Sequence, residues 1–294
     1  MMLTVTSIYN KRVRFLDSFI HGLIYLCASI SILLLAGIVA YVAYQGISEV
    51  SWSFLTTVPS AIKGTFGIAG NIINTIYIII ITLIISVPFG VGAAIYLNEY
   101  AKPGKLVSLI EFTTETLSGI PSIIFGLFGY VFFGQTLQLG YSILTGALTL
   151  ALMVLPLITR NTQEALKSVP SSYRSGALGI GATKWYMIRT ILLPSAMPGI
   201  ITGIILSIGR IVGESAALLF TSGSGYLLPK VGKYGEGLFQ KILQPGGTLT
   251  IQLYLSMEKG EYESAFGIAF VLLIIVLGIN LLTKYLAHKL DVNK

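Results

Sequence analysis

Charged residues are scarce in this sequence. Asp, Glu, Lys and Arg make up 11% of the 294 residues, whereas about 25% is typical of a soluble domain. Hydrophobic residues make up 54%, and several apolar runs exceed the roughly 18 residues that mark a candidate membrane span. The polar segments between these runs are too short to build a soluble domain. The composition therefore predicts an all-α, polytopic membrane protein.

Residues and motifs that carry catalytic or metal chemistry are also few. Cys27 is the single cysteine and lies inside an apolar run, which excludes an intrachain disulfide or a C-x-x-C site. His21 and His288 have no partners at metal-ligand spacing. The sequence contains no G-x-x-x-x-G-K-[ST] phosphate loop, H-E-x-x-H or G-x-S-x-G. We therefore expect a non-catalytic chain without a metal or cofactor, whose energy comes from another subunit.

The net charge of +7 raises the question of nucleic-acid binding. The basic residues are spread over short loops between apolar runs, which is the pattern that orients membrane proteins. Most of the 19 Lys and Arg residues fall in the segments that lie inside if the N-terminus is inside. We therefore expect both termini to be cytoplasmic, in the plasma (inner) membrane, and no nucleic-acid partner.

Six apolar runs are long enough to be spans. Residues 1–18 form a polar, basic segment before the first run, 19–44. This run is too long for a signal peptide and lacks an A-x-A site, so we interpret it as a retained anchor. Gly and Pro interrupt the later runs, as expected of helices that pack in a bundle. The remaining chain, 72–287, is predicted to hold spans at 72–97, 116–133, 141–158, 200–221 and 265–286, a cytoplasmic loop at 159–198 and an outer loop at 222–264.

The fifth run carries two charges, Arg210 and Glu214, at positions i and i+4. On one helix these side chains would share a face. A charge at bilayer depth costs about 2.5–3.5 kcal/mol on insertion scales and normally faces a protein interior or an aqueous path. The pair could be a structural ion pair. It could also mark an anion path, because the Arg guanidinium binds oxyanions in a bidentate way.

The loop before the fifth run holds the most specific motif. It resembles the cytoplasmic loop of ABC-importer permeases, E-A-A-x3-G-x9-I-x-L-P, although Ser175 and Gly176 replace the family Glu and first Ala. A short amphipathic helix held outside the membrane can insert into a groove of a partner protein, and a solvated loop with interfacial helices is the alternative. We expect Pro194 to end this helix and Pro198 to begin the next span. The matching positions are Ala177, Gly181, Ile191, Leu193 and Pro194.

A second resemblance concerns the substrate. The stretch SIGRIVGESAALLFTSG is similar to the fifth-span signature of phosphate-importer permeases of the PstA type, with Ser215 and Ala217 in place of the family Thr and Pro. This resemblance implicates Arg160, Arg210 and Glu214 in transport. Taken alone, Arg160 would be interpreted as an orientation anchor at a helix end.

The resemblance implies an ABC importer type I permease-like bundle with a cytoplasmic coupling helix. Its partners would be a second homologous permease, two ATPase subunits that bind ATP and Mg²⁺, an extracytoplasmic phosphate-binding protein, and membrane lipid. The expected function is import of inorganic phosphate by alternating access. The alternatives are a permease for phosphonate, molybdate or sulfate, an ion-coupled secondary transporter that uses Arg210 and Glu214 as a proton relay, and a membrane enzyme acting on lipid phosphate.

Overall fold

The computed structural model describes residues 15–59, 66–102, 104–229 and 236–290. Most of the predicted N-terminal segment lies outside this part of the chain. The described residues fold into helices joined by turns, without strands. Five of these helices are long and apolar enough to cross a membrane, or six if one bent pair counts as a span. The prediction of an all-α polytopic bundle is confirmed.

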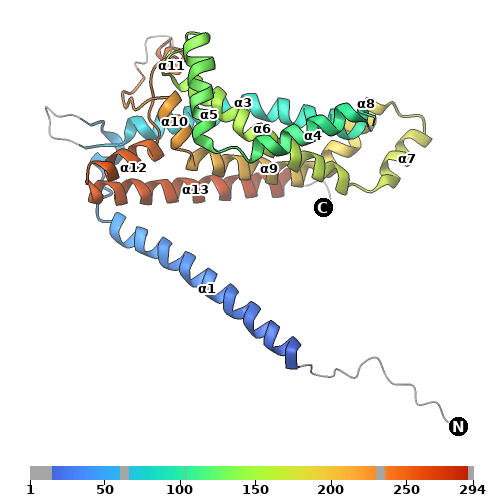
Figure 1. Cartoon of the computed structure of the whole chain (residues 1–294), viewed down its shortest axis with the longest axis horizontal. Helices are drawn as coiled ribbons and strands as arrows, with labels where there is room; N and C mark the ends of the chain where they lie inside the picture. Colours follow the sequence, from blue (N-terminus) through green and yellow to red (C-terminus); the bar gives the residue numbers. More distant parts are fainter. Residues whose placement is uncertain (1–14, 60–65, 103, 230–235, 291–294) are drawn as a thin grey trace.

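The first helix, α1 (Phe15–Gly46), projects away from the rest of the molecule, which it meets only near its C-terminal end (Figure 1). The main bundle consists of α3 (Ala69–Ile95), α6 (Ile143–Ser168), α9 (Leu193–Gly213) and α13 (Tyr262–Leu290). Helices α3 and α6 form the most extensive pair, and α6 also packs along α9. The buried side chains that join these helices are mainly aliphatic, with interspersed Asn, Thr and Ser side chains such as Asn74, Thr82 and Ser207.

Small residues let the bundle helices approach closely. A Cβ on Gly90 of α3 would lie 2.8 Å from the Ile158 side chain of α6, and a Cβ on Gly203 of α9 would lie 2.6 Å from Asn161. Thr82 of α3 donates its hydroxyl hydrogen to the carbonyl oxygen of Ala147 in α6. Close backbone approach and polar links of this kind are typical of helix packing in lipid.

The predicted third span, 116–133, is not one helix. The chain forms α4 (Lys105–Ser118) and then α5 (Ser122–Gly129), which continues as the π-helical η2 (Tyr130–Thr136), and the two parts meet at 103°. Pro121 lies at the bend. Its ring disfavours helical dihedrals at the residue before it, and it has no backbone N–H to donate.

The predicted loop at 159–198 is largely helical. Helix α6 extends to Ser168 and is followed by α7 (Ser171–Gly179) and α8 (Lys184–Met187). Pro194 does not end a helix, because Lys184–Gly213 is continuous through α8, the π-helical η3 (Ile188–Leu192) and α9. The π-helical turn before Pro194 widens the helix where the proline cannot donate a hydrogen bond.

The predicted fifth span, 200–221, is also divided. Helix α9 ends at Gly213, and a separate short helix, α10 (Ala216–Thr221), follows an extended Glu214. The outer segment that comes next contains α11 (Glu236–Ile242) and α12 (Leu249–Glu258), and another short helix, α2 (Trp52–Thr56), precedes α3. Figure 1 shows α10, α11 and α12 at one end of the bundle and α7 at the opposite end.

The outer segment is attached to α3 through two asparagines. Asn71 and Asn74 both donate side-chain N–H groups to the carbonyl oxygen of Gly247, at 3.0 and 3.2 Å. Asn74 also donates to the carbonyl oxygen of Gly225 at 2.9 Å. These hydrogen bonds fix a segment whose composition alone indicates only flexibility.

Candidate functional site

A cavity of about 500 Å³ opens between α4, α6 and α9. Its apolar floor includes Met153 and Leu157 of α6. Its other walls are polar and carry three basic and three acidic side chains. These are Arg160, Lys167 and Arg210, and Glu111, Glu115 and Glu164.

Arg160 is the basic residue with ion-pair partners in this cavity. Its Nη1 lies 3.7 Å from a carboxylate oxygen of Glu115 on α4, and its Nε lies 3.4 Å from Oε1 of Glu164 on the next turn of α6. All three side chains are more than half exposed, so water screens these pairs and each contributes at most about 1 kcal/mol. The guanidinium is therefore weakly held and accessible to an anion.

Arg210 reaches the same cavity from the last turn of α9. A cation at this position is favoured by the partial negative charge of the helix C-terminus. Within the described residues Arg210 forms no ion pair. The structure thus brings together Arg160 and Arg210, two of the three residues predicted for the substrate path.

Glu214, the third residue predicted for the substrate path, has a different position. The expectation that it shares a helical face with Arg210 is wrong, because α9 ends one residue earlier. Its Oε1 accepts a hydrogen bond from the backbone N–H of Ala217 at 3.0 Å, and its carbonyl oxygen accepts one from the Thr250 hydroxyl. The carboxylate thus caps the first turn of α10, whose N–H groups favour a negative charge. Glu214 does not line the cavity.

The motif glycine, Gly181, lies in the turn between α7 and α8. Gly181 has a φ of +83°, and its N–H donates to the carbonyl oxygen of Leu178. This left-handed residue just past a helix end is the usual position of a terminating glycine. Thr183 then caps α8 by accepting a hydrogen bond from the N–H of Tyr186. The motif glycine is thus explained by the sharp reversal between the two short helices.

The other motif residues are part of the protein interior. Ala177 is buried in a cluster with Met187, Ile188 and Leu192, and Ile191 and Leu193 pack against the same cluster. These side chains hold α7 against the start of the long helix. Ile191, Leu193 and Pro194 are partly exposed, and their predicted contact with an ATPase subunit stays a prediction.

Exposed apolar side chains cover the outside of α7, α8 and the turn between them, and the sequence analysis did not identify them. Ile180 is 86% exposed. A cluster of large exposed apolar side chains marks an interaction surface. We call this set the loop surface: Tyr173, Leu178, Ile180, Trp185 and Tyr186.

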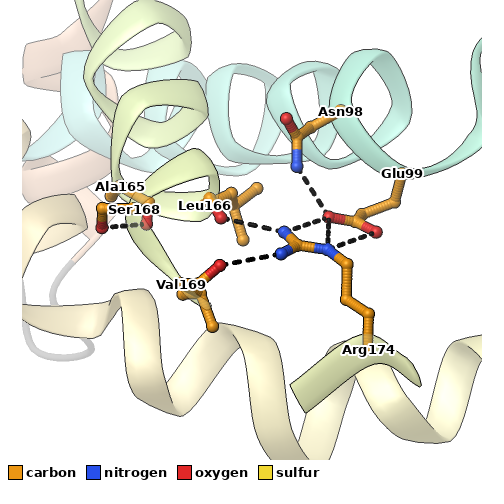
Figure 2. Close-up of polar contacts among 7 residues, drawn as sticks. All are labelled: Asn98, Glu99, Ala165, Leu166, Ser168, Val169 and Arg174. Atoms are coloured by element: carbon orange, nitrogen blue, oxygen red, sulfur yellow. Dashed lines mark hydrogen bonds and ion pairs between the residues drawn. The ribbon is translucent and has the colours of Figure 1, made fainter. Parts of the chain in front are cut away.

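A partly buried ion pair, also absent from the predicted site, joins α7 to the π-helical η1 (Tyr96–Tyr100) at the end of α3. Nη2 of Arg174 lies 2.8 Å from Oε1 of Glu99 (Figure 2). The Glu99 side chain is only 5% exposed. Sequence offers little signal for this contact, because the partners are far apart in the chain and each lies in a short polar segment.

Metal binding finds no support in the geometry. Within the described residues, no group of three or more His, Cys, Asp and Glu side chains is arranged to hold a metal ion. The cavity contains two arginines, which are planar, permanently charged donors. Its three carboxylates balance its three basic side chains, so the formal net charge of the lining is zero.

Comparison with known proteins places residues 86–292 in the family described as "Binding-protein-dependent transport system inner membrane component". A Bacillus subtilis (strain 168) protein named "Probable ABC transporter permease protein YqgI" is 37% identical over 94% of this chain and 96% of its own length. A Xylella fastidiosa (strain 9a5c) protein named "Phosphate transport system permease protein PstA" is 36% identical over 63% of this chain and 62% of its own length.

Solved structures share the fold at low sequence identity. A chain of a bacterial alginate ABC transporter, crystallised with an alginate pentasaccharide-bound periplasmic protein, superposes with a TM-score of 0.66 and 13% identity, over 94% of this chain and 96% of that one. A chain of the MetNI methionine ABC transporter in an inward-facing conformation gives a TM-score of 0.56 and 19% identity, over 76% of this chain and 94% of that one.

Proposed function

This chain belongs to the binding-protein-dependent transport system inner membrane component family, and we propose that it is the permease subunit of an ATP-driven importer of inorganic phosphate. The predicted resemblance to importer permeases is confirmed. The chain is a multi-pass, non-catalytic membrane component of an ABC importer, and ATP hydrolysis takes place on a separate subunit.

One observation carries the proposed substrate class: Arg160 and Arg210 line a single cavity between α6 and α9. Guanidinium groups bind tetrahedral oxyanions through paired, charge-assisted hydrogen bonds. The weak pairs to Glu115 and Glu164 let an arriving anion displace a carboxylate without a large loss of binding energy. An anion held in this way can also leave again, as transport requires.

Phosphate is favoured over other oxyanions by two considerations. Relatives at 34–36% identity are named as phosphate transport permeases. In addition, hydrogen phosphate keeps a proton near neutral pH that it can donate to a carboxylate such as Glu111 in the cavity wall, whereas sulfate has no proton to donate. A site that uses a substrate hydroxyl discriminates strongly against analogues without one.

In this proposal the chain pairs with a second, homologous permease and rests on two ATPase subunits that bind ATP and Mg²⁺. The loop surface docks on an ATPase, since exposed apolar side chains on a short helix can insert into an apolar groove of a partner. A phosphate-binding protein delivers substrate at the opposite end, and both chain termini are cytoplasmic. ATP-driven closure of the ATPases then shifts the population between outward-facing and inward-facing states.

Labelled-phosphate uptake by vesicles that contain the reconstituted complex tests this proposal. We expect uptake to require ATP on the ATPase side together with the binding protein. Uptake driven by a proton gradient alone would instead indicate a secondary transporter. Uptake of sulfate or molybdate in place of phosphate would support an ATP-driven importer but refute phosphate as its substrate.

A further inference from the structure

Arg174 connects three parts of the structure through one guanidinium. Its Nε and Nη2 donate to the carboxylate of Glu99 on η1, at 3.2 and 2.8 Å. The same side chain donates to the carbonyl oxygens of Leu166, at 2.9 Å, and Val169, at 3.0 Å, near the end of α6. Figure 2 shows these bonds converging from α7, η1 and the α6 end.

Two further contacts connect the end of α3 with the α7–α8 segment. The ammonium of Lys184, the first residue of α8, lies 4.9 Å from the centre of the Tyr100 ring, a favourable cation–π geometry. Val91 and Ile95 of α3 pack against the buried cluster that contains Ala177. The α3 end therefore contacts the segment on both sides of the Gly181 turn.

These contacts create a connection that the backbone does not provide. The chain joins α7 covalently to α6 and, through α8, to α9. Helix α3 has no such covalent connection: it packs along α6 and continues into the π-helical η1, which contains Glu99. A multidentate, partly buried Arg–carboxylate pair fixes orientation as well as distance.

We propose that Glu99 and Arg174 are positioning residues that make α3 move as one body with the α7–α8 segment. This inference rests on the proposed function, in which the loop surface receives movement from the ATPase. With the pair intact, displacement of α7 carries α3 along with α6 and α9. Without it, the ATPase still docks and hydrolyses ATP, but α3 follows less completely and transport becomes inefficient.

The first test measures ATP hydrolysis and phosphate uptake in the same vesicles, for Glu99→Ala, Arg174→Ala and the double variant. We expect hydrolysis to persist and the ATP consumed per phosphate to rise severalfold. The double variant should match either single variant, because the pair acts as a unit. Glu99→Gln, which keeps a neutral acceptor, should show a smaller increase. Arg189→Ala, at an exposed arginine on η3, is the matched control and should resemble the wild type.

The second test measures the distance between η1 and α7 directly and requires no phosphate. Spin labels are placed at two exposed positions, Tyr96→Cys on η1 and Ser172→Cys on α7, in a Cys27→Ser background. In the full complex we expect one narrow distance that is the same without nucleotide and with trapped ATP. Glu99→Ala should broaden or shift this distance in the trapped state.

Several outcomes would overturn the inference. One is a wild-type label distance that changes between the two states; another is Glu99→Ala vesicles whose ATP-to-phosphate ratio equals that of the wild type. If Glu99→Ala fails to assemble, the test rests on the ATP-to-phosphate ratio of Glu99→Gln and on the label distances in the wild type. A ratio equal to that of the wild type, or a distance that changes, then overturns the inference. A wild-type complex that hydrolyses ATP without moving phosphate would refute the proposed substrate, whereas the label distances would still test the link between α3 and α7.

Discussion

Arg160 and Arg210 line one cavity from neighbouring helices, but within the described residues only Arg160 has carboxylate partners there. Arg210 is exposed in the last turn of α9. In the proposed function, an unpaired guanidinium beside a weakly paired one would give the anion two successive binding positions. We therefore regard Arg210 as the stronger anion-binding group of the two.

The substitution Arg210→Gln tests this assignment. A hydrogen bond to a charged group contributes about 1.5–3 kcal/mol, so uptake should fall by roughly 10- to 100-fold. Membrane level and ATPase association should stay unchanged, because the side chain is exposed. The initial rate of labelled-phosphate uptake is the measurement. Arg189→Gln removes the same charge from the same continuous helix, away from the cavity, and normal uptake by Arg210→Gln would refute the assignment.

The substitution Ile180→Asp tests the loop surface. Burying one large aliphatic side chain contributes about 1.5–3 kcal/mol, and a carboxylate cannot enter an apolar groove without a partner. We expect the ATPase to dissociate from the permease during purification while the permease level stays normal. Leu137→Asp, at an exposed leucine near the opposite end, should retain the ATPase. Retention by Ile180→Asp would mean that docking uses another surface.

Two glycine substitutions distinguish the role of the α7–α8 turn in ATPase association from the role of helix α7. A side chain at Gly181 is strained by the positive φ, at about 1–2 kcal/mol, so Gly181→Ala should weaken ATPase association. Gly176→Ala, inside α7 where the new Cβ meets no neighbour, should stabilise α7 by up to about 1 kcal/mol and preserve association. Co-purification of the two variants with the ATPase provides the comparison. Equal behaviour would argue against a role for the turn.

Because Lys241 is buried, we predict that the free energy of unfolding depends on pH. The Lys241 side chain is 1% exposed, its ammonium lies 3.4 Å from the Pro245 carbonyl oxygen, and burial lowers its pKa from the usual 10.5. The folded chain then releases this proton more readily than the unfolded chain, so the cost of burying the charge is present at pH 7. This cost disappears as pH rises from the lowered pKa toward 10.5.

The substitution Lys241→Met removes the buried charge and keeps an apolar stem. We expect a higher unfolding temperature than the wild type at pH 7, by roughly 2–4 °C for each kcal/mol recovered. This advantage should shrink as the pH approaches 10. Thermal unfolding in detergent at several pH values measures it. An advantage that stays constant with pH would contradict the assignment to Lys241.

The sequence identified the fold class because long apolar runs with interspersed Gly and Pro have few structural solutions in lipid. It did not identify the bend near Pro121 or the end of α9 at Gly213, because the apolar composition continues across both breaks. The break at Gly213 had one readable signal, since Glu214 and Ser215 precede a short apolar helix as capping residues often do.

The site could be predicted only where an unusual charge or a motif pointed to it. Arg210 was identified by its charge inside an apolar run and Arg160 by a family resemblance, and the structure adds the cavity that they share. The ion pair between Glu99 and Arg174 depends on how α3 packs beside α7, which no local pattern records. The sequence located the loop motif as a segment, and its role in coupling stays a prediction. Of its residues Ala177 is buried and Ile191 and Leu193 pack against the same cluster, whereas the exposed apolar side chains of the loop surface lie at neighbouring positions that the motif does not specify.

The central claim is that ATP hydrolysis by a partner drives phosphate through this chain. The most direct measurement is labelled-phosphate uptake by vesicles that contain the complete complex, with ATP, without ATP, and with a proton gradient alone. We predict uptake only with ATP, little competition from excess sulfate, and loss of uptake in Arg210→Gln. Uptake that is independent of ATP, or that excess sulfate abolishes, would contradict the account.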